Sequence, residues 1–154
     1  KDETEKKETR GNGIQIKVEE DNETAVEGNR VVTTNKTKVE LLKIKQVGQK
    51  IECHFRFTNV GPDVQFYLYS GGYYNLTKLI DTNNGLEYSA TQVELGEFVN
   101  NGYVVKTLIT NNPVTAKITF DGAATKVKKI ARLTGRCMGH GGYFVFEMRD
   151  IVMD

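Results

Sequence analysis

Hydrophobic and polar residues alternate with a period of two through most of the chain. The segment GIQIKVEE, residues 13–20, begins this pattern, with Ile14, Ile16 and Val18 set against polar neighbours. Such alternation is typical of a β-strand with one buried face and one face in water. We therefore read the chain from Ile14 onward as a series of strands.

The segment KIECHFRFTN, residues 50–59, shows the alternation most clearly. It follows KVELLKIKQV, residues 38–47, and only Gly48 and Gln49 separate the two. Two strands joined by a Gly-containing dipeptide predict a tight β-hairpin. The residues expected to face the core along the second strand are Ile51, Cys53, Phe55 and Phe57, and those expected to oppose them are Phe120, Phe144 and Phe146.

Further strands are predicted along the rest of the chain. They cover residues 64–70, 76–81, 86–93, 103–109, 114–120, 126–133 and 143–152. The sequences between them, such as NVGPD, TNNG, NNP and GHGG, have the composition of turns. No segment has the pattern of an amphipathic helix, and 15 glycines punctuate the chain. The pattern predicts an all-β protein with the architecture of a β-sandwich.

Length and composition indicate how the chain is divided into domains. A chain of 154 residues with 38% hydrophobic and 27% charged residues has the size and balance of one globular domain. Residues 1–13, KDETEKKETRGNG, contain no apolar side chain, so we predict a disordered charged tether there and a single domain over residues 14–154. No apolar run approaches the about 18 residues that a membrane span needs.

The net charge of +1 conceals an uneven distribution. Residues 1–29 hold five Lys or Arg and nine Asp or Glu, whereas the remainder holds 16 and 11. Neither balance is typical of a protein that binds polyanions, and no module combines aromatic with basic residues. We expect no nucleic-acid partner.

The segment KLIDTNNGLEY, residues 78–88, crowds oxygen-bearing side chains around a glycine. An EF-hand loop needs glycine at its sixth position and glutamate at its twelfth. Counting from Asp81, Gly85 falls at position five and Gln92 at position twelve. The register does not fit a calcium loop, and we interpret the segment as a turn between two strands.

Cys53 and Cys137 allow two interpretations. Both are in phase with apolar neighbours, so they can be two buried free thiols. They can also form a disulfide between the sheets, which would close a loop of 83 intervening residues. A zinc site with His54 and His140 lacks the usual ligand spacing, and His54 points away from Cys53. We predict no metal and no cofactor.

The chain carries no recognisable catalytic motif. G-x-S-x-G, H-E-x-x-H and the phosphate loop are absent from the sequence. Carboxylates such as Asp81, Asp121 and Asp150 are what remains for acid–base chemistry. We expect a protein that is not an enzyme.

Two segments are candidates for binding. QFYLYSGGYYNL, residues 65–76, contains Tyr67, Tyr69, Tyr73 and Tyr74 around a Gly-Gly bend. These tyrosines are either half-buried sheet residues or an outer patch that binds a sugar ring or a protein. KVKKIAR, residues 126–132, is either a solvated strand face or a patch for acidic glycans or lipid head groups.

Several of these segments resemble one family. KIECHFRFTNVGPD, LIDTNNGLEY, ITFDG and FEMRDI resemble, in this order, strands and turns of the telokin-like immunoglobulin family, which has no known function and occurs in bacterial extracytoplasmic proteins and lipoproteins. The likeness covers roughly residues 36–152. It implies an immunoglobulin-like antiparallel sandwich of about seven to nine strands without established catalytic residues.

The first three residues, KDE, resemble the short signal that follows the lipidated cysteine of surface lipoproteins in one large group of Gram-negative bacteria. This likeness implies a lipid anchor upstream of Lys1 and a place at the cell surface or in the periplasm. We therefore expect a non-enzymatic, extracytoplasmic module of a cell-envelope lipoprotein that acts in adhesion or protein interaction. The alternative is a carbohydrate- or glycan-binding module that uses the tyrosine-rich loop.

Overall fold

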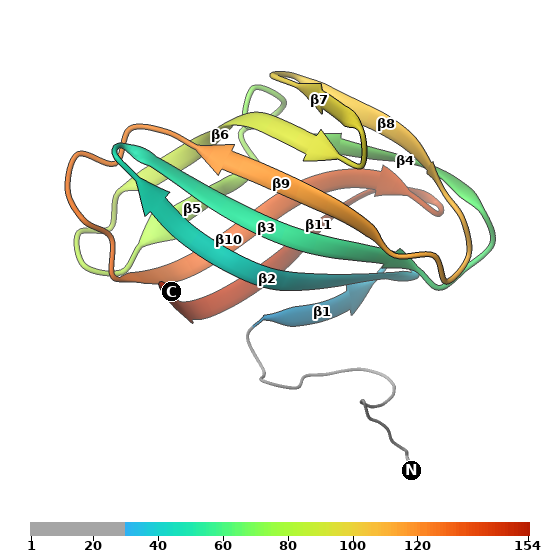
Figure 1. Ribbon diagram of the computed structural model, residues 1–154, viewed down its shortest axis with the longest axis horizontal. Coiled ribbons are helices and arrows are strands. Elements are labelled where there is room, and N and C mark those ends of the chain that lie inside the picture. Colours follow the sequence, from blue (N-terminus) through green and yellow to red (C-terminus); the bar gives the residue numbers. More distant parts are fainter. Residues whose placement is uncertain (1–29) are drawn as a thin grey trace, which may run out of the picture.

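Eleven antiparallel strands and no helix make up residues 30–154, the part of the chain that the computed structural model describes (Figure 1). The strands are Val31–Thr34 (β1), Thr37–Val47 (β2), Lys50–Asn59 (β3), Val64–Tyr69 (β4), Lys78–Asp81 (β5), Glu87–Leu95 (β6), Phe98–Asn100 (β7), Tyr103–Leu108 (β8), Val114–Phe120 (β9), Lys129–Gly139 (β10) and Gly142–Val152 (β11). The predicted all-β class is confirmed. The tether expected at residues 1–13 and the strand expected at residues 13–20 lie outside the described residues.

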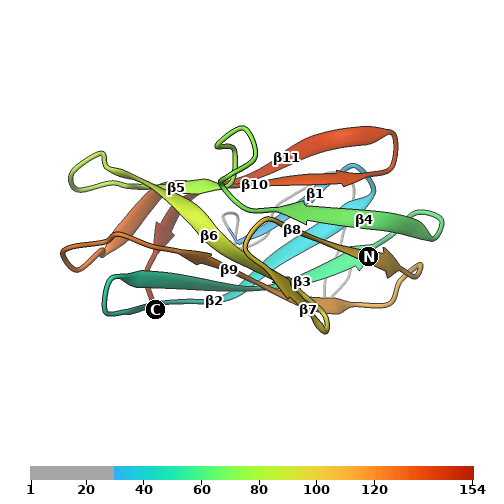
Figure 2. The ribbon, with the colours of Figure 1, turned by 90° about the horizontal axis from the view of Figure 1, so that it is seen from above.

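The strands form two facing layers that derive from one continuous sheet. The hydrogen-bonded order is β1-β2-β3-β9-β6-β5-β10-β4-β8, with β11 on β10 and β7 on β6. Strand β6 belongs to both layers, because its first residues pair with β5 and the stretch from Ala90 to Leu95 pairs with β9. Figure 2 shows β6 crossing from the layer of β10, β11 and β4 to the layer of β2, β3 and β9. The result is a β-sandwich.

Most predicted strands occur close to their expected places. The β2–β3 hairpin is confirmed, with Val47 paired to Lys50 and Gly48 at a φ of +62°. The main difference is β10, which begins at Lys129 and runs on to Gly139, well beyond residue 133. Gly135 and Gly139 interrupt the alternation of hydrophobic and polar residues there, so the pattern does not predict a strand beyond residue 133. The short strand β7 was not anticipated.

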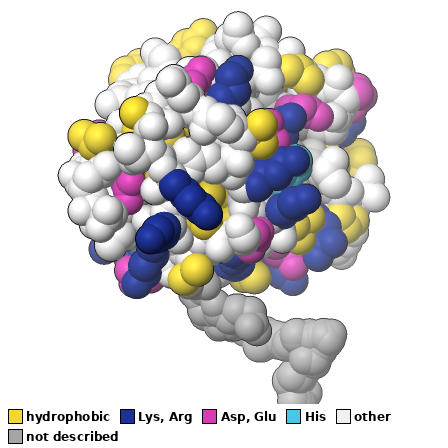
Figure 3. Space-filling view, turned by 60° about the vertical axis from the view of Figure 1, so that its left-hand side comes forward, with side chains coloured by type: hydrophobic (Ala, Val, Ile, Leu, Met, Phe, Trp, Pro, Cys, Tyr) yellow, Lys and Arg dark blue, Asp and Glu magenta, His cyan; other side chains and the backbone are white. Residues whose placement is uncertain are grey.

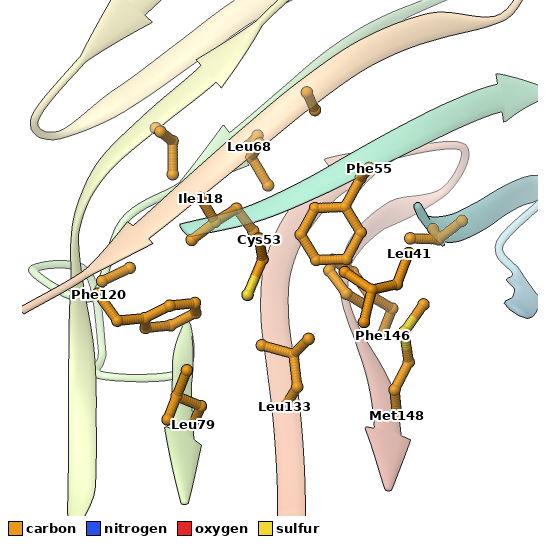
Figure 4. Packing of buried hydrophobic residues seen from close by; sticks show 14 of the residues in the cluster. Leu41, Cys53, Phe55, Leu68, Leu79, Ile118, Phe120, Leu133, Phe146 and Met148 are labelled. Carbon is orange, nitrogen blue, oxygen red and sulfur yellow. The ribbon is translucent and has the colours of Figure 1, made fainter. Parts of the chain in front are cut away.

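The core lies between the two layers. Ile51, Cys53, Phe55 and Phe57 are at most 1% exposed, as the alternation along β3 predicts. Figure 4 shows Cys53 and Phe55 pointing from β3 toward residues of β10 and β11. The ring of Phe146 on β11 lies 5.5 Å from that of Phe55, so Phe146 opposes β3 as expected.

Of the other two predicted partners of β3, Phe144 lies in the facing layer and Phe120 does not. Phe120 is fully buried, but it belongs to β9, where its backbone aligns with Ile51 in the same layer. It therefore flanks β3 and does not oppose it, which corrects the prediction. Phe144 is partly buried at the margin of the core and packs against Phe66 with ring centroids 6.0 Å apart.

The two cysteines are buried free thiols. Cys53 lies on β3 and Cys137 on β10, both fully buried, and no disulfide joins them. Burial raises the pKa of both thiols, so both side chains are neutral at physiological pH. Of the two interpretations that the sequence allowed, the structure contains the free thiols.

Gly135 gives room to the central aromatic ring of the core. It lies in the middle of β10, directly across from Phe146 on β11. A Cβ atom added to Gly135 would lie 2.2 Å from the ring carbon Cε2 of Phe146, far inside contact distance. The absence of a side chain at this position is therefore a packing requirement.

We expect Phe55→Ala to lower the free energy of unfolding by about 3–5 kcal/mol, because it empties a fully enclosed position in the core. Arg56→Ala is the matched control on the next residue. Its guanidinium is on the outer face, where it pairs with Glu40 at 2.9 Å, and we expect a loss below about 1 kcal/mol. Urea unfolding measures both. Similar midpoints for the two variants would contradict the register of β3.

We expect Gly135→Ala to destabilise the domain by about 1–3 kcal/mol, because the new methyl group collides with the Phe146 ring. Phe146→Leu would relieve the collision at the cost of a smaller side chain. In a double-mutant cycle, the double variant should therefore lose less than the sum of the two single losses. Additive losses would show that the ring does not occupy the space at Gly135.

Candidate binding site on the outer face of β4 and β10

Strand β4 sends alternate side chains into the core and out to the surface. Phe66 and Leu68 are fully buried between the layers. Tyr67 and Tyr69 therefore lie on the outer face of the sheet, as the alternation predicts. Across the ladder, Tyr69 aligns with Tyr103 on β8, which brings a third tyrosine to the same face.

Tyr69 is the centre of an aromatic cluster. Its ring centroid lies 6.1 Å from that of Tyr67, 5.5 Å from Tyr103, 5.4 Å from Tyr73 and 5.9 Å from Tyr143. The surrounding rings cover Tyr69, which is only 6% exposed although it lies outside the core. The tyrosine patch comprises Tyr67, Tyr69, Tyr73, Tyr74, Tyr103, Tyr143 and Arg136.

Arg136 is the one charged member of the tyrosine patch. It lies on β10 opposite Tyr69, and it is 8% exposed. Its guanidinium carbon is 4.1 Å from the ring centroid of Tyr143, 4.4 Å from that of Tyr74 and 4.8 Å from that of Tyr69. An arginine placed over aromatic rings at such distances is attracted by their electron-rich faces. Between residues 30 and 154, no carboxylate pairs with it.

The buried Thr77 forms hydrogen bonds to both β4 and β10 beneath the tyrosine patch. The Thr77 hydroxyl donates a hydrogen bond to the carbonyl of Tyr69 at 2.7 Å and accepts one from the backbone N–H of Arg136 at 2.9 Å. Gly71 begins the loop between β4 and β5, and its N–H donates to the carbonyl of Ala90 at 2.9 Å. These bonds fix the base of the loop that carries Tyr73 and Tyr74.

Tyr74 has an unusual backbone conformation. Its φ is +63° and that of Asn75 is +51°, a region that favours glycine. The Ser89 hydroxyl donates a hydrogen bond to Oδ1 of Asn75 at 2.6 Å, which holds the turn in this shape. The strained turn places the ring of Tyr74 over Arg136 while leaving the residue 77% exposed.

The hydroxyl of Tyr69 remains neutral over the whole physiological range. Burial raises its pKa, a hydrogen bond with Tyr143 raises it further, and the charge of Arg136 acts in the opposite direction. The positive charge of Arg136 therefore lies beside a phenol group that stays neutral.

The outer face of the other layer has a different character. Its charged side chains pair with one another across neighbouring strands. The pairs are Arg56–Glu40 at 2.9 Å, Lys45–Glu52 at 3.8 Å and Lys117–Glu94 at 4.0 Å. Such a face is typical of a solvated sheet. The tyrosine patch, with its uncovered rings, is the better candidate for a binding surface.

All four tyrosines singled out in the sequence belong to the tyrosine patch. The sequence analysis missed Tyr103, Tyr143 and Arg136. Tyr103 and Tyr143 follow turns of the type NNG and GHGG, so each begins a strand, but their position beside β4 depends on the strand order. Arg136 was missed because the strand was expected to end at residue 133.

The Asp81 segment is a turn, as predicted. Oδ1 of Asp81 accepts a hydrogen bond from the N–H of Asn83 at 2.9 Å, and the carbonyl of Asp81 accepts one from Gly85 at 2.9 Å. Gly85 has a φ of +71°. Across residues 30–154, no group of three or more His, Cys, Asp or Glu side chains is placed to hold a metal ion.

Only the second half of the basic segment at residues 126–132 is a strand. Lys126 and Lys128 are exposed in the connection between β9 and β10, and β10 begins only at Lys129. This connection lies at the left of Figure 1, the side that Figure 3 brings forward. Lysine and arginine side chains there are spread among acidic and uncharged ones (Figure 3). This distribution favours the interpretation of solvated charges over that of a concentrated anion-binding patch.

No protein-family model and no curated protein matches the chain. Over the described range, no helix is long and apolar enough to cross a membrane.

We expect the neutral Tyr69 to make stability sensitive to alkaline pH. A tyrosine in the unfolded chain loses its proton near pH 10, whereas folded Tyr69 keeps it to higher pH. The unfolded state then binds fewer protons than the folded state, so the free energy of unfolding falls as pH rises above about 10. Urea unfolding between about pH 8 and about pH 11 should show a smaller fall for Tyr69→Phe than for the wild type. The buried thiols contribute equally to both proteins, and identical pH profiles would contradict the assignment.

Proposed function

We propose that this domain is a non-enzymatic interaction module that binds a protein partner on the tyrosine patch. The observation that carries the proposal is the gathering of six tyrosines and one arginine on one outer face. Tyrosine and arginine are the residues most often responsible for affinity at protein interfaces. Tyr74 and Tyr143 are 77% and 60% exposed, so a partner can reach their rings.

The rigidity of the tyrosine patch supports the same proposal. Tyr67, Tyr69 and Tyr103 are anchored on strands, and Thr77 joins β4 to β10 beneath them. Each ring also packs against at least one other ring of the patch. Side chains that are already ordered lose little conformational entropy when a partner binds, so more of the contact energy becomes affinity.

A carbohydrate-binding module is the alternative. The rings of Tyr67 and Tyr69 are inclined by only 12°, and those of Tyr67 and Tyr103 by 28°, an arrangement that a chain of sugar rings could follow. The burial of Tyr69 argues against it, because neighbouring rings occupy the surfaces on which a sugar would stack. Exposed hydroxyl edges with apolar ring surfaces suit a protein interface better.

The place of the module in the cell is a separate proposal. We retain the hypothesis of an extracytoplasmic immunoglobulin-like domain of an envelope lipoprotein, supported by the resemblance of residues 50–63 and of the first three residues to such proteins. The encoded sequence upstream of Lys1 tests it. An apolar segment that ends in cysteine would support a lipid anchor, and a continuing folded domain would contradict it.

We expect ligands selected on the wild-type protein to lose at least about tenfold in affinity for the double variant Tyr103→Ser/Tyr143→Ser. The selection uses a displayed peptide library and, in parallel, a glycan array. Val47→Ser is the control, since it removes an exposed apolar side chain at the end of β2, where Val47 is 53% exposed.

Selected peptides that require both tyrosines support the protein-binding proposal. Glycans that require them, in the absence of such peptides, would replace it by the carbohydrate alternative. Ligands that bind the double variant as well as they bind Val47→Ser would show that the tyrosine patch is not the binding surface.

A further inference from the structure

Arg136 is largely buried, yet the described part of the chain gives its guanidinium no carboxylate partner. The residue is 92% buried, and within residues 30–154 its guanidinium has neither an ion pair nor a hydrogen bond to a side chain or backbone oxygen. Interactions with the rings of Tyr74 and Tyr143 compensate part of the cost of burying the charge. The rings accept nothing in the plane of the guanidinium, where its N–H groups point, and no oxygen of residues 30–154 accepts from them.

Two other basic side chains on this outer face have partners of their own. Lys78, beside β10 on the same outer face, pairs with Glu87 at 3.2 Å. Arg149 pairs with Glu147. Their charges are therefore largely neutralised by groups of this chain.

A comparison with Arg132 shows what distinguishes the surroundings of Arg136. It lies four residues before Arg136 on the same strand and also has no carboxylate partner within the described range. It is half-exposed and no aromatic ring covers it, so water satisfies its N–H groups. Among residues 30–154, Arg136 is thus the one basic group of this face that is enclosed by aromatic rings and has no partner.

We propose that the partner places one carboxylate on Arg136, flanked by apolar side chains that contact the surrounding tyrosines. This inference rests on the proposed function and specifies the chemistry of the partner. A guanidinium held flat by aromatic rings presents two parallel N–H donors to a carboxylate, and such charge-assisted pairs are stronger than neutral hydrogen bonds. The recognised element is an acidic residue within an otherwise apolar peptide segment.

A sulfated glycan or an anionic membrane fits this face less well. Both present many negative charges and are bound by several free cations spread over a surface. Here a single arginine without a partner in residues 30–154 lies among the rings, and of the nearby cations Lys78 and Arg149 are paired with carboxylates. One charge in apolar surroundings is complementary to one carboxylate in apolar surroundings.

The test uses two short peptides with blocked ends. One has a single glutamate between two leucines, and the other has glutamine in place of the glutamate. Binding is followed by tyrosine fluorescence and by the NMR resonance of the Nε–H group of Arg136. We expect the glutamate peptide to bind at least about tenfold more tightly than the glutamine peptide and to shift the Arg136 resonance.

Three variants show whether the preference for glutamate depends on Arg136. Arg136→Lys keeps the charge but lacks the two parallel donors, so it should reduce the preference for glutamate severalfold. Arg132→Lys should leave the preference unchanged. Tyr74→Ala removes an exposed ring that covers Arg136, and it tests the same point if Arg136→Lys does not fold. It should also weaken the preference.

Each outcome decides between the inferences. Equal binding of the two peptides, both weakened by Tyr143→Ser, would overturn the carboxylate while leaving the protein-binding function intact. Binding of a heparin oligosaccharide that depends on Arg136, with no binding of either peptide, would overturn the peptide in favour of a sulfated glycan. Absence of binding by all three probes would overturn the carboxylate inference, and the peptide library would then decide the proposed function by itself.

Discussion

The position of every outward side chain depends on a cluster of phenylalanine rings between the two layers. Phe57 lies 5.9 Å from Phe146 and 5.6 Å from Phe66, while Phe55 lies 5.5 Å from Phe146. All of these contacts are edge-to-face, the arrangement that aromatic pairs prefer. Since side chains alternate along a strand, burial of Phe66 and Phe146 determines which residues of β4 and β11 face outward. The tyrosine patch is therefore a consequence of the core.

Strand pairing supplies what alternation alone does not. Arg136 lies between β4 and β11, with Tyr69 aligned on one side and Val145 on the other. A slip of one residue would turn Arg136 into the core and Cys137 outward, which would bury an unpaired charge. The hydrogen bonds of Thr77 to both strands oppose such a slip. The same register that protects the core thus assembles the arginine with its tyrosines.

The sequence predicts where the strands begin and end better than it predicts which strands lie next to one another. Alternation was sufficient for β3 and β9, whose bounds match, and for the outward direction of Tyr67 and Tyr69. It could not show that Phe120 lies beside β3, because both layers contribute phenylalanines with the same spacing. It also failed on β10, where Gly135 has the composition of a turn. Glycine is needed at position 135 because the ring of Phe146 on the neighbouring strand occupies the space of a side chain, and the sequence pattern around residue 135 does not show this contact.

Strand β6 has a mechanical consequence for the whole domain. Because it pairs with β5 at one end and with β9 at the other, backbone hydrogen bonds connect the two layers through β6, with an irregularity in the register between Ala90 and Gln92. The layers cannot separate like two independent sheets, since opening them would tear the ladder along β6. A force applied at either layer is carried to the other through backbone hydrogen bonds as well as through the core. The sandwich should respond to load as one elastic unit, a useful property for any surface that has to hold a partner in place.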